Sequence, residues 1–247
     1  MMTRVWPALL FAALVFMIWS ALPAMFPIPE FLLPRPVAVW KVLTNNRGDL
    51  AAHAAATFSE ALLGLVVAAS GGIILGSLFA VFNLFERMLL PFAIASQAVP
   101  IVAVAPVLVL WLGSGIQSKI AMAALICFFP MVVSTSKGLR AATAEQLAVM
   151  HVYDASKVQL FCKLQLPSSL PFLFSGLRVS AALATIGAIV GEYAGADRGL
   201  GYVIVQSTYR LDTAELFAAI ACAALGGLLL FILVTITERA FLRRFTR

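Results

Sequence analysis

The chain has 247 residues, of which 62% are hydrophobic and only 11% are charged. Soluble domains contain about 45–50% apolar and about 25% charged residues, so this composition excludes a water-soluble enzyme or DNA-binding domain. The net charge of +6 comes from few charged side chains. We attribute this excess of positive charge to the orientation of a membrane protein in the bilayer rather than to nucleic-acid binding. The three cysteines form no CxxC pair and are predicted to be buried small hydrophobic residues, neither disulfide partners nor metal ligands.

Six apolar runs are long enough to cross a bilayer, whose core of about 30 Å requires roughly 20 apolar residues per helix. They cover approximately 6–26, 55–82, 88–112, 120–136, 168–191 and 214–237. The first exceeds the apolar part of a signal peptide and is expected to remain as a helix. The sequence therefore predicts an all-α, polytopic membrane protein with six transmembrane helices and one transmembrane domain over 1–247.

The first long connection, 27–54, opens with prolines and continues with Val37, Trp40 and Leu43 at near-helical spacing. This spacing predicts a short helix. Two interpretations fit it: a helix in the membrane interface with Trp40 as its anchor, or a helix packed over the bundle.

The third run contains the polar residues Ser96 and Gln97, followed by Pro100 and Pro106. Proline removes a helical hydrogen bond, so we expect a kinked helix here. The amide of Gln97 either faces a translocation path or bonds a neighbouring helix. Ser96, Gln97 and Pro100, together with Glu192 at the end of the fifth run, are the candidate path residues, although Glu192 is equally compatible with an interfacial anchor.

A second long connection covers 137–167. Residues 141–150 are strong helix formers, and Asp154 is predicted to N-cap a second short helix that ends at Leu166–Pro167 and Pro171. Two short helices joined at an elbow would offer a compact knob to a cytosolic partner. An ordinary solvated loop is equally compatible with these residues.

The last run, 214–237, is preceded by Asp212, and Glu215 follows three residues later. A carboxylate at this spacing is typical of a helix N-cap in a capping-box arrangement. Asp212 is therefore predicted to cap the last helix.

Lys and Arg residues are divided unevenly between the two sides of the six-span arrangement. The side that holds both termini and 137–167 carries 11 of the 17, whereas most acidic residues lie on the other side. Positive residues mark the cytoplasmic side. Both termini are therefore predicted to be cytoplasmic, with 27–54 outside.

The stretch 148–167 resembles the cytoplasmic loop signature of binding-protein-dependent ABC importer permeases, E-A-A-x3-G-x9-I-x-L-P. Leu164, Leu166 and Pro167 match its second half, whereas Ala148 stands at the acidic position and Asp154 at the glycine. Glu145, one helical turn before Ala148, could present a carboxylate on the same face. The resemblance assigns contact with an ATPase subunit to Glu145, Ala148, Asp154, Lys157, Leu164, Leu166 and Pro167.

Other segments extend the resemblance over most of the chain. Residues 31–40 and 96–113 are similar to the nitrate, sulfonate and taurine permease family, and 191–202 resembles that family's outer loop after the fifth helix. Within the family, the outer loop is most similar to members for thiamine pyrimidine precursors or riboflavin. The resemblance assigns Gly176, Arg178, Gly199 and Gly201 to structural motifs, with Arg178 in a structural role.

The sequence motifs that are missing from the chain limit the activities that we expect of it. It lacks the P-loop pattern G-x4-G-K-[ST], metal-ligand spacings and a Ser-His-Asp candidate, so it is predicted to be no enzyme and to hold no cofactor or metal. No ionisable residue lies at the centre of a run, which argues against a proton-coupled carrier.

The resemblance implies a transport subunit in the bacterial inner membrane, in contact with lipid and not with nucleic acid. Its implied partners are a second copy, cytoplasmic ABC ATPase subunits that use the ATP, and a periplasmic or lipid-anchored substrate-binding protein. The alternatives are a self-sufficient secondary transporter or channel and a membrane assembly factor without transport. Neighbouring genes for an ATPase and a binding protein would favour the importer.

Overall fold

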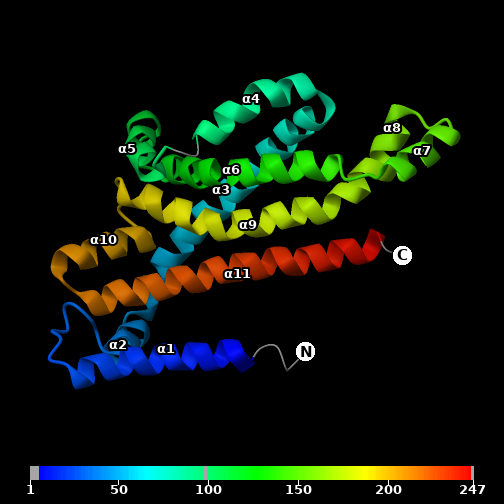
Figure 1. Cartoon of the computed structure of the whole chain (residues 1–247). Helices are drawn as coiled ribbons and strands as arrows, with labels where there is room; N and C mark the ends of the chain where they lie inside the picture. Colours follow the sequence, from blue (N-terminus) through cyan, green and yellow to red (C-terminus); the bar gives the residue numbers. More distant parts are fainter. Residues whose placement is uncertain (1–5, 97–98, 246–247) are drawn as a thin grey trace.

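The computed structural model describes residues 6–96 and 99–245, which form helices joined by short connections (Figure 1). The first half contains α1 (Trp6–Met25), α2 (Pro36–Asn45), α3 (Arg47–Val81), α4 (Asn83–Ser96) and α5 (Ile101–Leu112). The second half contains α6 (Ile116–Leu139), α7 (Ala144–Val152), α8 (Lys157–Leu160), the π-helix η2 (Phe161–Gln165), α9 (Leu166–Tyr193), α10 (Leu200–Arg210) and α11 (Thr213–Phe245).

The long helices form an elongated bundle in which α6 lies between α3 and α9, and α11 packs along α9 (Figure 1). Within residues 6–96 and 99–245, four continuous helical stretches are long and apolar enough to cross a membrane: Arg47–Val81, Ile116–Leu139, Lys157–Tyr193 and Thr213–Arg243. Helices within Leu9–Met25 and Ile101–Leu112 are apolar but shorter. The predicted all-α membrane fold is confirmed, whereas the count of six spans stays a prediction, and α3 begins at Arg47, well before the predicted 55.

Small residues bring α3 and α6 into close contact. A Cβ atom on Gly72 would collide with Met131, and one on Gly76 would collide with Thr135. Backbones that approach this closely gain van der Waals contact over a long interface, which matters in lipid because lipid tails provide little hydrophobic drive between helices. The α3–α6 pair is therefore a tightly packed unit of the bundle.

The third apolar run forms two helices and not the single kinked helix predicted for 88–112. Pro100 directly precedes α5. Proline has no N–H to donate within a helix, and it disfavours helical geometry in the residue before it, so the helix is interrupted here. Pro106 lies inside α5. Together, α4 and α5 return the chain to the end of the bundle where α6 begins (Figure 1).

The predicted short helix after the proline-rich stretch is α2, which begins at Pro36. Its residue Val39 is buried in a cluster that includes Ala219 of α11, and the Trp19 indole of α1 donates a hydrogen bond to the Pro34 carbonyl, 3.1 Å away. Trp40 is exposed. One face of α2 thus packs over the bundle, while the Trp40 side chain stays exposed.

The predicted helix end at Leu166–Pro167 is wrong. Helix α8 passes through η2 directly into α9, and Pro167 stands in the first turn of α9. The wider π-turn lets the Leu166 N–H donate to the Phe161 carbonyl, five residues back. This local change of register lets the helix continue across a proline that would interrupt the ordinary bonding pattern.

The predicted burial of the cysteines is confirmed for Cys127 but not for Cys162. All three cysteines are free of disulfide bonds. Cys127 is buried in α6, and its thiol donates a hydrogen bond to the Ser180 carbonyl. Cys162 is exposed, against the expectation of burial, because η2 projects beyond the packed part of the bundle.

Candidate functional site

The elbow segment, residues 140–165, projects from one end of the bundle with α7 and α8 (Figure 1). Thr143 caps α7: its hydroxyl accepts from the Gln146 N–H, and the Gln146 side chain accepts from the Thr143 N–H. This capping box explains why α7 begins after the two alanines that the sequence pattern included. The knob is therefore built from its own short-range hydrogen bonds.

The sequence predicted that Asp154 N-caps the second short helix, and this prediction is wrong. The cap is Ser156, which forms a capping box with Gln159. Asp154 instead holds a left-handed backbone conformation, with φ of 48°. Glycine adopts this conformation without steric penalty, which gives a physical reason for the glycine of the resembling signature.

Apolar side chains on the elbow segment face outward. Val152, Tyr153 and Val158 are among its most exposed residues, at 84%, 79% and 71%. Exposed apolar side chains on a projecting, helix-capped segment are typical of a protein-binding surface. Glu145 is also exposed, and hydrogen bonds to its own backbone N–H and to Thr143 lower the pKa of its carboxyl, so it stays charged at neutral pH.

The structure places the predicted contact residues in two groups. Glu145, Ala148, Asp154 and Lys157 are exposed on α7, α8 and the turn between them. The matching residues Leu164, Leu166 and Pro167 lie where η2 joins α9, at the base of the elbow segment. The first group is available to a partner, whereas the second sets how the knob joins the bundle.

A second group of polar and ionisable side chains lies at the opposite end of the bundle. We call it the end cluster, and it contains His53, Thr57, Glu60, Lys119 and Glu192. The Thr57 hydroxyl donates to Glu192 Oε1 at 2.6 Å and accepts from the Leu200 N–H at 2.8 Å. His53 Nδ1 accepts from the Gly199 N–H at 2.9 Å. These bonds hold the start of α10 against α3.

Two ionisable members of the end cluster escaped the sequence analysis. Glu60 and Lys119 are almost completely buried, and Lys119 Nζ donates to the carbonyls of Ser114 and of Gly195, the latter 3.0 Å away. Glu60 lies near Glu192 and Lys119, and its Oε2 has no hydrogen-bond partner among the described residues. Ionisable residues close to the ends of apolar runs are the signal that could have identified them.

The end cluster borders a polar cavity of about 410 Å³. Its lining includes Glu60 and Lys119 together with Asp197 and Arg198 from the connection between α9 and α10. Acidic and basic side chains thus line the same cavity.

Glu192, a candidate path residue of the sequence analysis, makes well-defined contacts in the structure, and its place on a translocation path stays a prediction. Its carboxylate accepts from Thr57 and from the Gly201 N–H, and it is 2% exposed. A Cβ atom at Gly199, where φ is +111°, or at Gly201 would collide with this carboxylate. Glu192 thus holds the loop to α10, and the two glycines leave the space that it fills.

The other candidate path residues are less defined. Pro100 is exposed at the start of α5, whereas Gln97 and the side chain of Ser96 lie outside the described part of the structure. Their place on a translocation path stays a prediction.

The two remaining motif residues tie helices together. A Cβ at Gly176 would collide with Ser134 of α6, so the glycine permits close packing of α9 on α6. Arg178 forms an ion pair of 3.2 Å with Glu238 of α11. Both contacts fit a structural role within the bundle.

Comparisons with known proteins identify the family. A family model described as "Binding-protein-dependent transport system inner membrane component" matches residues 72–247. The riboflavin transport permease RibX of Chloroflexus aurantiacus is 38% identical, covering 96% of this chain and 91% of its own. The formylaminopyrimidine permease ThiX of Halalkalibacterium halodurans is 36% identical, with 94% and 93% covered, and the putative aliphatic sulfonate permease SsuC of Bacillus subtilis is 32% identical, with 95% and 86% covered.

A solved structure of the inward-facing MetNI methionine ABC transporter contains a chain of similar fold. Its TM-score is 0.58 at 17% sequence identity, covering 84% of this chain and 99% of that one. At this identity, the likeness concerns the fold alone. The family model and the relatives above show that this chain belongs to the binding-protein-dependent inner membrane components, the permeases of ABC importers.

Proposed function

We propose that two copies of this chain form the translocation path of an ABC importer and that each elbow segment docks a separate ATPase subunit. The observation that carries the proposal is the elbow segment, which projects from the bundle (Figure 1) and, by its residue exposures, carries exposed apolar side chains. ATP is bound and hydrolysed by the partner subunit in this assembly, and a substrate-binding protein delivers the solute from the opposite side.

The orientation follows from charge. Most Lys and Arg residues lie on the side of the elbow segment, which supports an orientation with that side and both termini in the cytoplasm of a bacterial inner membrane. Closure of the ATPase subunits then moves the two elbow segments, and the path changes from inward to outward facing.

The transported solute is a nitrogen heterocycle of the flavin or aminopyrimidine type. The names of the 38% and 36% identical relatives, a riboflavin and a formylaminopyrimidine permease, support this class over the sulfonates of the 32% identical one. Uptake of labelled riboflavin, formylaminopyrimidine and taurine, each with the cognate binding protein and ATPase, tests the choice. Uptake of taurine alone would contradict it.

Co-purification with the cognate ATPase tests the docking surface. Tyr153→Glu places a charge in an apolar contact, and we expect loss of the ATPase together with loss of binding-protein-stimulated hydrolysis. Tyr209→Glu is a matched control, because Tyr209 is similarly exposed, at 83%, but lies on α10 at the other end. Normal ATPase binding by the Tyr153 variant, or solute flux through the chain alone in liposomes, would contradict the proposed function.

A further inference from the structure

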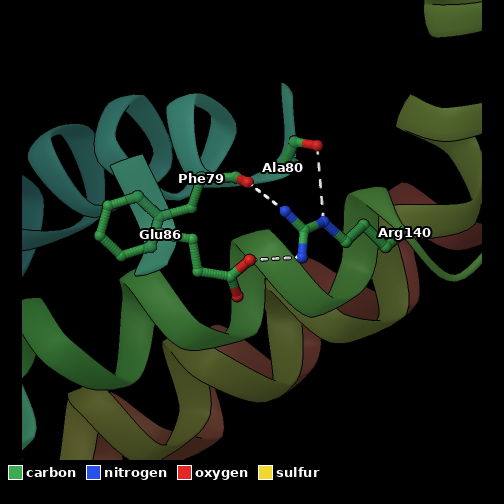
Figure 2. A network of polar contacts seen from close by, with 4 residues as sticks. All are labelled: Phe79, Ala80, Glu86 and Arg140. Carbon is green, nitrogen blue, oxygen red and sulfur yellow. Dashed lines mark hydrogen bonds and ion pairs between the residues drawn. The ribbon is translucent and has the colours of Figure 1, made fainter. Parts of the chain in front are cut away.

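Arg140 joins three helices at the base of the elbow segment. It directly follows α6, and its guanidinium reaches the last turn of α3, where Nε donates to the Ala80 carbonyl at 3.4 Å and Nη2 donates to the Phe79 carbonyl (Figure 2). Nη1 forms an ion pair of 2.5 Å with Glu86 in the first turn of α4 (Figure 2). One side chain therefore connects the start of the elbow segment with the corner between α3 and α4.

The planar guanidinium suits this corner. The last carbonyls of a helix lack partners within the helix and favour a cation, and arginine can address several acceptors at once in a fixed geometry. The side chains of Arg140 and Glu86 are 37% and 26% exposed, so water weakens the ion pair only in part. A lysine could keep the charge but could not reproduce all three contacts.

The two helices that meet at this corner are held differently. In the described part of the chain, α3 packs extensively against α6, and α4 contacts α3. The ion pair with Glu86 is therefore one of the contacts that set the direction of α4, and α4 leads to α5. A displacement at Arg140 would move α4 before it moved α3.

We propose that Arg140 is a positioning residue that passes movement of the elbow segment to α4 and α5, so that opening of the path follows ATP-driven closure. The inference rests on the proposed docking of an ATPase at the elbow segment. It assigns the α3–α4 corner a role in coupling, beyond that of the docking surface itself.

The first test measures solute transported per ATP hydrolysed by the complete importer in proteoliposomes. For Arg140→Gln and Glu86→Gln, we expect the ATPase to bind and its stimulated hydrolysis to persist, while the ratio falls roughly fivefold or more. Arg140→Lys should recover part of the ratio, since it keeps the ion pair. A purely structural defect would lower transport and hydrolysis together, because both depend on the same assembled fraction.

A matched control is Arg35→Gln, which removes the exposed Arg35–Glu30 pair of 3.7 Å outside the α3–α4 corner. Its ratio should equal that of the wild type. An unchanged ratio in Arg140→Gln, or an equal fall in the Arg35 variant, would overturn the inference. Failure of the wild type to bind the ATPase would instead refute the proposed function.

A second test follows the helices directly. Spin labels at Leu89 of α4 and Leu125 of α6, in a background without native cysteines, report the position of α4, and a label at Cys162 alone, which is exposed in η2, reports the elbow segment. We expect both to shift on ATP trapping in the wild type, and only the elbow segment to shift in Arg140→Gln. The same shift of α4 in this variant would contradict the proposal.

Discussion

Asp154 sits at the turn between α7 and α8 with φ of 48°, a conformation that carries a steric penalty for residues with a Cβ. Aspartate tolerates it better than most residues, because its short polar side chain can bond locally. The Asp154 and Ala155 N–H groups both donate to carbonyls near the end of α7, at 3.0 Å, which fixes the turn. The elbow thus depends on backbone conformation more than on the charge of its aspartate.

Substitutions at Asp154 should therefore follow backbone preference. Asp154→Gly should leave the elbow intact, whereas Asp154→Val should destabilise it by roughly 1–2 kcal/mol, since a β-branched residue fits the left-handed region poorly. Hydrogen exchange of 150–160 in nanodiscs, together with ATPase co-purification, measures both effects. Equal protection in the two variants would show that the conformation at this turn is unimportant.

Glu192 should matter for stability through the donors that it satisfies. Glu192→Ala leaves the Gly201 N–H without its buried acceptor and removes one of the two acceptors of the Thr57 hydroxyl, which can still bond the His53 carbonyl at 3.2 Å; the start of α10 should be destabilised by about 1–3 kcal/mol. Exchange of the amides at 199–205 should rise, and the melting temperature in detergent should fall. Glu30→Ala, which removes an exposed carboxylate, is the control and should change neither quantity.

At the scale of elements, α3 and α6 show how small residues position helices. Gly72→Ala puts a methyl group against Met131 of α6, so the helices must separate, and such overpacking costs about 1–3 kcal/mol. Gly48→Ala, in the same helix with open space around it, should instead stabilise by roughly 0.5–1 kcal/mol. Unfolding in mixed micelles compares the two; a similar effect of both would contradict the close-packing argument.

Helix α11 begins with the cap that its sequence predicts. The Glu215 N–H donates to Asp212 Oδ1 at 3.1 Å, although the Glu215 carboxylate accepts from Ser207 of α10 and thereby links the two helices. Asp212→Ala should destabilise the first turn by about 0.5–2 kcal/mol and raise exchange at 212–220. Unchanged exchange there would mean that the contact with α10, rather than the cap, holds the turn.

Apolar run length and local capping patterns made much of the fold predictable. They indicated α1, α6 and α11, the short helix α2 and the cap at Asp212, because these features depend on residues close in sequence. The continuity of α8 into α9 could not be predicted, since it depends on a π-turn before Pro167. The burial of Glu60 depends on contacts with distant helices, which no local pattern encodes.

At the scale of the whole molecule, the ends of the bundle are chemically distinct. The start of α1, the end of α11 and the elbow segment lie toward one end, while α2, α10 and the connection between α9 and α10 lie toward the other (Figure 1). The first end carries most of the Lys and Arg residues, and the second contains the end cluster. The arrangement of helices thus agrees with the charge distribution that orients the chain.

This agreement makes the orientation testable with single cysteines. In a background without Cys127, Cys162 and Cys222, Lys157→Cys on α8 and Arg198→Cys in the connection after α9 should react with an impermeant maleimide from opposite sides of the membrane. Lys157 should be protected in intact cells and react in inverted vesicles, because an excess of positive residues marks the cytoplasmic side in the proposed orientation. Arg198 should show the reverse.

Arg35→Cys, directly before α2, is the control for the outer end and should behave like Arg198→Cys, since α2 and the connection between α9 and α10 lie toward the same end of the bundle (Figure 1). If Lys157 and Arg198 were labelled from the same side, the segment between them would not cross the membrane once, as the bundle orientation requires. Because α9 is the single long helix that separates these residues, that result would place α9 parallel to the membrane and contradict the bundle orientation as a whole.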